Sequence, residues 1–330
     1  MKNICLTLLI VTTLLGCKED HKNSGKDDLL PSSTGTMNTV SVVVDNASWE
    51  GIVGAQVRDV LAASIYGLPQ DEPIFNINQI PPHVFDGFIT KNRTILKLTK
   101  GNKNIIFKDN VYAKPQKVIE ISGQSKKEII TVLNDNKDKI IDVFKGIELK
   151  AKQKLIRKSL YKATVIKDNL GLKINFPTAY RVAKTIATDA DKFYWIKRDI
   201  PTGYVNLLIY ELPDHKINKD TSIVPQIVKI RDSIGKKYIE GPVEGSYYIT
   251  EKAYTPFQTK TIINNKPALV TKGLWEVKNA FMAGPYVNYA IEDKINKRWL
   301  VVEGFVYAPS VSKRNYMFEL EAIIKSIKIQ

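Results

Sequence analysis

The sequence predicts an α+β fold of two domains, and three observations lead to this prediction. Short runs of β-branched and aromatic residues follow one another between turns of Gly, Asn, Lys and Pro, which indicates mainly antiparallel sheets. Amphipathic segments that could cover these sheets do not alternate regularly with the runs, which favours α+β over α/β. The chain has 330 residues, whereas single cores rarely exceed roughly 250 to 300, so we expect domains at 39–163 and 164–330.

The first domain is predicted to end in a long helix over 125–161, because apolar residues recur there at steps of three and four. The stretch 134–136 is expected to bend or divide it. A shorter helix is predicted over 49–64, with Asn46 and Ser48 as candidate N-caps. The strands of this domain are expected at 40–44, 74–77, 94–98, 105–107 and 118–121.

The second domain is predicted to be strand-rich, with one helix in its middle and one at its end. Isoleucines within 223–234 recur at steps of four, three and four, and a similar apolar stripe over 317–327 predicts the last helix. The strands are expected at 172–176, 193–196, 204–210, 247–250, 259–263, 268–277, 286–292 and 299–307.

The first sixteen residues have the composition of a removable signal peptide. Lys2 supplies one cation, residues 4–15 form an apolar run, and Gly16 is a small residue directly before Cys17. As a helix this run would span about 18 Å, less than a hydrocarbon core of roughly 30 Å, so a permanent transmembrane helix is the weaker interpretation. Residues 17–38 are polar and predict a flexible tether.

The tetrad Leu14, Leu15, Gly16, Cys17 resembles the lipobox of bacterial lipoproteins, in which a peptidase cuts before a cysteine that already carries a diacylglyceryl thioether. The resemblance implies that Cys17 receives acyl chains such as palmitate. Two or three chains, at about 0.8 kcal/mol per buried CH₂, make an effectively permanent anchor. The alternative is a cysteine that ends a signal peptide by chance.

Lys18, Glu19 and Asp20 follow the cysteine directly. A cation followed by two acids resembles the export signal that sends some lipoproteins to the outer face of the outer membrane. The resemblance implies an outer-membrane protein of the cell envelope that is exposed at the cell surface, with the inward-facing side of the same membrane as the alternative.

Charge and cysteine usage bear on partners and on stability. The formal charge is +15, and removal of residues 1–16 takes away one lysine and leaves +14. So basic a protein favours an anionic glycan or lipid as its partner, although a generic basic surface is the alternative. Cys5 would be lost with the leader, so Cys17 would be the only thiol and no intramolecular disulfide is expected.

The sequence assigns no catalytic, metal or cofactor site. Its three histidines, His21, His83 and His215, have no metal-ligand spacing. No phosphate-binding loop, dinucleotide fingerprint or Gly-x-Ser-x-Gly elbow is present. We therefore expect no metal ligands and no bound cofactor, and carboxylates remain as the groups that could run a hydrolysis.

One stiff acidic loop stands out as a candidate recognition surface. It carries Pro69, Gln70, Asp71 and Glu72, and prolines at both ends restrict its conformations. Glu211 and Asp214 flank Pro213 in a second acidic turn. Paired carboxylates could perform acid/base glycan hydrolysis if they faced each other across a cleft, but acid-plus-proline is also ordinary turn composition.

Several stretches together resemble an uncharacterised family of Bacteroidetes-type lipoproteins that is known only as a domain of unknown function. They are 30–35, the Trp49, Gly51, Gly54 cluster, 67–70, the Glu72, Pro73, Phe75 group and Arg93. The last half also looks like the α/β/α sandwich of PsbP- and Mog1-type domains. That likeness implies an antiparallel sheet with helices on both faces, and adaptor roles more often than catalysis.

These observations favour a non-catalytic binding or scaffolding module at the outer membrane. The expected partners are the membrane, reached through the lipid anchor, and an envelope protein or an anionic glycan or lipid. Nucleic acid is not expected at this location. The alternative function is a carboxylate-based hydrolase of envelope glycan.

Overall fold

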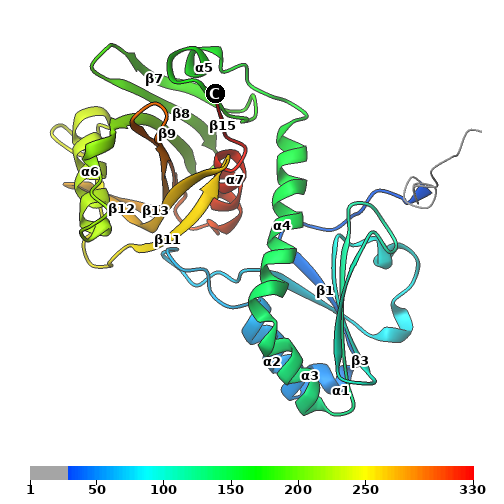
Figure 1. The fold of residues 1–330 in the computed structure, drawn as a ribbon. Coiled ribbons are helices and arrows are strands. Elements are labelled where there is room, and N and C mark those ends of the chain that lie inside the picture. Colours follow the sequence, from blue (N-terminus) through cyan, green and yellow to red (C-terminus); the bar gives the residue numbers. More distant parts are fainter. Residues whose placement is uncertain (1–28) are drawn as a thin grey trace, which may run out of the picture.

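A computed structural model describes residues 29–330, so the expected leader, Cys17 and the tripeptide 18–20 lie outside the described residues. The chain forms two sheets, each with its own helices, and helix α4 (Lys137–Ile156) extends from the first sheet towards the second (Figure 1). The predicted α+β class is confirmed. None of the helices within residues 29–330 combines the length and the apolar character needed to cross a bilayer.

The first sheet has the strand order β2-β1-β3-β5-β4. Its β1–β2, β1–β3 and β3–β5 pairs are parallel and its β4–β5 pair is antiparallel, so the expectation of a mainly antiparallel sheet was wrong here. The cause is the connection from β1 to β2, which contains two helices and returns the chain to the same end of the sheet. The strands are β1 (Thr39–Val43), β2 (Asn76–Ile80), β3 (Thr94–Lys100), β4 (Asn104–Asp109) and β5 (Lys117–Gly123).

Helices cover one face of this sheet, and the expected division of the long helix is confirmed at Asn136. The N-cap of the first helix is Asp45, whose carboxylate accepts a hydrogen bond from the Ser48 amide at 2.8 Å, so neither of the two residues expected to cap it does so. Apolar side chains of the sheet pack against α2, α3 and α4. The helices are α1 (Asn46–Glu50), α2 (Ile52–Leu61), α3 (Lys126–Asp135) and α4, and the short 3₁₀ turns are η2 (Pro82–Val84) and η3 (Gly87–Lys91).

The second sheet is antiparallel, as expected, and has the order β10-β12-β13-β14-β9-β8-β7, with β11 paired to β12. It curls into a half-barrel (Figure 1). The edge strand β7 was not predicted, because most of its side chains are exposed and show no buried alternation. The strands are β7 (Arg181–Ala187), β8 (Lys192–Ile200), β9 (Gly203–Pro213), β10 (Tyr247–Thr250), β11 (Phe257–Ile263), β12 (Lys266–Lys278), β13 (Ala280–Asp293) and β14 (Arg298–Tyr307).

Helices lie on both faces of the half-barrel, which agrees with the expected α/β/α arrangement. On one face α7 packs over Leu300 and Val302, and on the other α6 packs over Trp299 and Val301. The strand predicted at 172–176 is shorter than expected and forms a separate two-stranded sheet. These elements are α5 (Thr164–Leu170), β6 (Leu172–Lys173), η4 (Asp214–Lys216), α6 (Ile223–Tyr238), α7 (Arg314–Ile324) and β15 (Lys328–Ile329).

Polar contacts tie the two domains together along α7. The amide of the Gln153 side chain donates to the Ala322 carbonyl at 3.1 Å. Lys152 of α4 forms an ion pair with Glu319 of α7 at 2.6 Å. The Arg314 guanidinium donates to the Pro73 carbonyl at 3.0 Å. Helix α7 therefore packs on the second sheet and also makes polar contacts with the first domain.

Candidate binding site: a basic groove on the second domain

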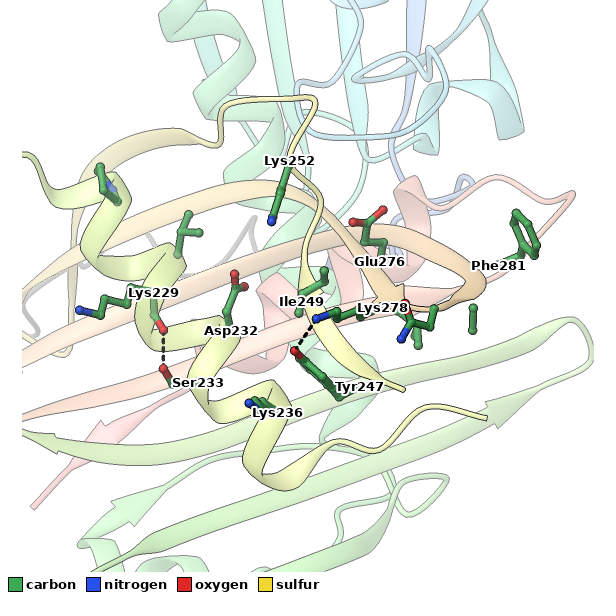
Figure 2. A pocket seen from close by; sticks show the side chains of 15 residues that line it. Lys229, Asp232, Ser233, Lys236, Tyr247, Ile249, Lys252, Glu276, Lys278 and Phe281 are labelled. Carbon is green, nitrogen blue, oxygen red and sulfur yellow. Dashed lines mark hydrogen bonds between the residues drawn. The ribbon is translucent and has the colours of Figure 1, made fainter. Parts of the chain in front are cut away.

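A groove with a volume of about 1140 Å³ lies between α6, β10 and the hairpin that joins β12 to β13. Figure 2 shows Asp232, Lys252 and Lys278 directed into this space and Phe281 at its far end. Phe281 is fully exposed. The remaining lining residues are Pro225, Val228, Lys229, Ser233, Lys236, Tyr247, Ile249, Glu276, Val277, Asn279 and Ala280.

The periodicity of α6 explains which of its residues reach the groove. Its isoleucines at 223, 227, 230 and 234 pack against the sheet, so the positions between them face outwards. Lys229 and Lys236 are seven residues apart, two helical turns, and therefore share that outer face. Gly235 allows α6 to lie close to β10, because an added Cβ would be 2.1 Å from the Tyr248 carbonyl oxygen.

Four lysines from three parts of the chain converge on the groove. Lys229 and Lys236 come from α6, Lys252 follows β10, and Lys278 ends β12. All four are exposed, and none of them forms an ion pair with any residue between 29 and 330. Two carboxylates, those of Asp232 and Glu276, also line the groove, so the groove carries an excess of positive charge.

Tyr247 lies beside two of these cations. The Lys278 ammonium donates a hydrogen bond to the Tyr247 hydroxyl at 3.3 Å and lies 5.5 Å from the centre of its ring. The Lys236 ammonium lies 5.9 Å from the same ring centre. Both ammonium groups are within the distance at which a cation is attracted to an aromatic face. The ring therefore holds two lysines close together without neutralising them.

A buried polar network fixes the walls of the groove. Arg231 of α6 forms an ion pair with Glu303 of β14, Nε to Oε2 at 2.7 Å, and also donates to the hydroxyls of Tyr248 and Thr250. The Tyr248 hydroxyl and the Asn288 amide each donate to Glu303 at 2.7 Å. One guanidinium thus joins α6 to β10 and β14.

Thr250 connects this network to the groove. Its amide and its hydroxyl donate to Asp232 Oδ1 at 2.7 and 2.8 Å, while its hydroxyl oxygen accepts from Arg231. Asp232, which lines the groove, is therefore held by its contacts to β10. Arg231 faces the core and its neighbour Asp232 faces the groove. Because both bind Thr250, the position of Asp232 depends on that of Arg231.

Arg231 is a charged group that burial by itself strongly disfavours. Burial alone would lower the pKa of Arg231, but the Glu303 carboxylate and the tyrosine hydroxyls outweigh it and raise that pKa well above its usual range. Burial raises the pKa of Tyr286 to about 12, so this neighbour stays neutral. Arg231 remains charged at neutral pH, and its stability in the core depends on Glu303.

The four residues of the recognition loop predicted from the sequence lie in different environments. Glu72 is buried and binds the start of α7, where it accepts hydrogen bonds from the amides of Lys313 and Arg314 at 2.7 and 2.9 Å. Gln70 is exposed. Pro69 and Asp71 line a cavity of about 330 Å³ between the domains, apart from the basic groove.

The other sequence candidates are placed in structural roles. Glu211 pairs with Lys192 and Arg298, and Asp214 lies beside His215 at 3.7 Å. Among residues 29–330, no three His, Cys, Asp or Glu side chains are arranged to hold a metal ion. The groove lysines were not singled out from the sequence. The spacing of Lys229 and Lys236 was a usable signal, but Lys252 and Lys278 join them only through the pairing of β10 with β12.

A family model described as a domain of unknown function (DUF4837) matches residues 159–326, about half of the chain. The chain belongs to this family. A second model, described as a domain of unknown function (DUF8532), matches residues 33–157. The expected membership in a family of unknown function is thus confirmed, and the basic groove lies wholly within the DUF4837 part.

No curated protein matches the chain. A solved structure with some likeness is that of LpqN, described as involved in cell envelope biogenesis of Mycobacterium tuberculosis. It is 10% identical, with a TM-score of 0.28, and the match covers 48% of this chain and 82% of that chain. A likeness this weak has no bearing on the function of the DUF4837 domain.

Proposed function

We propose that this protein is a lipid-anchored component of the bacterial cell envelope, held at the outer membrane through Cys17, and that its basic groove binds an anionic glycan. The observation that carries the binding role is that four exposed lysines without ion pairs line one groove, two of them beside the ring of Tyr247. A chain of repeated anionic sugars fits a long open groove that offers cations and an aromatic face. The excess of basic residues over the whole chain would raise the rate of encounter with such a ligand.

The anchor rests on the pattern of residues 1–20, which predicts acylation of Cys17. We expect cells fed an alkyne analogue of palmitate to label the wild-type protein and a Cys5→Ser variant, and not a Cys17→Ser variant. The matched control separates the two cysteines of the chain. Labelling of Cys17→Ser, or none of the wild type, would contradict the anchor.

The placement at the cell surface follows from the resemblance of residues 18–20 to an export signal. Protease added to intact cells should then cleave the protein. Cleavage only after the outer membrane has been permeabilised would place it on the inner face instead, and would leave the anchor and the groove unaffected.

The groove is tested by reversing two of its charges. Lys236→Glu combined with Lys278→Glu should weaken binding of oligogalacturonate to the detergent-solubilised chain about tenfold, because each exposed ion pair contributes up to about 1 kcal/mol and reversal turns attraction into repulsion. Lys260→Glu with Lys294→Glu makes the same change in net charge at exposed positions outside the groove and should change binding little.

The outcomes of this titration separate the ligand classes. An equal loss of oligogalacturonate binding in both double variants would mean that only the net charge of the protein matters. It would contradict a binding site in the groove. Binding to vesicles of phosphatidylglycerol, but not to oligogalacturonate, would replace the glycan by a lipid headgroup. Shortening of the glycan during incubation, abolished by Glu276→Gln, would establish the alternative hydrolase, since Glu276 and Asp232 are the carboxylates of the groove.

A further inference from the structure

A second cavity, of about 310 Å³, lies between the two domains, and none of its lining residues belongs to the basic groove. It is bounded by α4 of the first domain, by α7 of the second and by the segment before β2. Its apolar wall comes from both domains and consists of Ile65, Leu68, Ile74, Leu149, Met317 and Phe318. This size and lining are typical of a site for a small organic ligand.

The cavity holds more cations than carboxylates. Glu321 already pairs with Lys272 at 2.5 Å, and the Arg314 guanidinium is occupied by carbonyl oxygens of the first domain. Lys145 and Lys325 also line the cavity, and neither forms an ion pair in the part of the chain that the structure describes. Two ammonium groups therefore face a space with no free counter-charge apart from Asp142.

The surroundings of Lys145 perturb its ammonium group. Desolvation within the cavity, and then repulsion by the Lys272 ammonium, lower the pKa of Lys145, and this outweighs the attraction of Glu321 and Asp142. The nearby cations also hold the pKa of Glu321 below its usual value, although burial alone would raise it. The charged form of Lys145 is thus less favoured here than in water, and an anion placed beside it would offset part of this cost.

We propose that this cavity binds a single-chain amphiphile, with its anionic head group against Lys145 and Lys325 and its alkyl chain along the apolar wall. Both features are needed, because a simple anion would leave the apolar wall exposed to water and a neutral chain would leave the ammonium groups unpaired. The ligand contacts α4 and α7 at once, so its binding strengthens the contact between the domains.

The test uses the full chain, held by its own anchor in phosphatidylcholine vesicles. Acetylation of Lys145 and Lys325 is followed by mass spectrometry while octanoate or acetate is added. Octanoate should protect both lysines, and protection should need less ligand as the chain grows from butanoate to octanoate, about fourfold less for each methylene that is buried. Octyl phosphate should behave as octanoate does, because the head group is recognised by its charge.

Two variants and a control identify the cavity as the site. Lys145→Met should raise the octanoate concentration that protects Lys325 about ten- to a hundredfold, the usual effect of losing a charged hydrogen bond. Lys150 is also exposed on α4 but lies outside the cavity, so Lys150→Met should leave the protective octanoate concentration unchanged. Gly146 lines the cavity and an added Cβ there meets no atom within 4 Å, so Gly146→Leu should fold and exclude octanoate.

Some results would overturn the proposal. Protection by acetate at the same concentration as octanoate would reduce the cavity to a simple anion site. Equal effects of Lys145→Met and Lys150→Met, or unchanged protection in Gly146→Leu, would place any bound amphiphile elsewhere. The groove variant Lys236→Glu with Lys278→Glu should keep the protection, so this result does not depend on the fate of the glycan proposal.

Discussion

Glu303→Gln should destabilise the second domain by about 3–5 kcal/mol, the usual cost of breaking a buried ion pair by removing one partner. Arg231 is completely buried, and its guanidinium would stay charged because its intrinsic pKa is very high. The charge would be uncompensated, since among residues 29–330 no other carboxylate contacts it. The glutamine amide has one acceptor oxygen where the carboxylate has two, so the donors from Arg231, Tyr248 and Asn288 could not all keep their acceptors. Urea unfolding followed by the fluorescence of Trp275 and Trp299, which lie in the same core, measures the loss.

Two comparisons show whether the pair itself is responsible. Glu292→Gln removes a carboxylate of the same sheet that pairs with the half-exposed Lys219, and should cost less than about 1 kcal/mol. Arg231→Met combined with Glu303→Met should be more stable than Glu303→Gln, because it removes the stranded charge. If the double variant were instead the less stable, the uncompensated guanidinium could not be the cause.

The stability of this pair bears on the groove because Arg231 and Asp232 are neighbours on α6. The hydrogen bonds that Thr250 makes to both residues transmit any movement of the guanidinium to the groove wall. A buried ion pair is weak evidence for stability, since apolar residues of the same volume often do as well. The ion pair between Arg231 and Glu303 matters here because it fixes the position of α6 over β10.

The second domain was easier to predict than the first for a physical reason. The central strands of the second sheet are buried on both faces and stand out as continuous apolar runs, as in β14. The edge strand β10 alternates between buried and half-buried side chains and coincides with the strand predicted at 247–250. Neighbours in such a sheet are also mostly neighbours in sequence. In the first sheet β5 lies between β3 and β4, so the local pattern located the strands but could not give their partners.

The site could be predicted only in part, because its residues meet through tertiary pairing. The register places Tyr247 of β10 opposite Lys278 of β12, although thirty-one residues separate them in the chain. No periodicity in the sequence reports such a pairing. Composition did report the excess of basic residues, and it pointed correctly to a charged surface without locating it.

Glu72→Gln should destabilise the protein by about 2–3 kcal/mol, because the carboxylate accepts two backbone amides and the Ser312 hydroxyl at the N-terminus of α7. Asp71→Asn, at the exposed neighbouring position, should stay within about 0.5 kcal/mol of the wild type. Thermal unfolding compares the two, and amide exchange at Lys313 and Arg314 should accelerate in Glu72→Gln alone. Equal exchange in both variants would mean that Glu72 does not hold the N-terminus of α7.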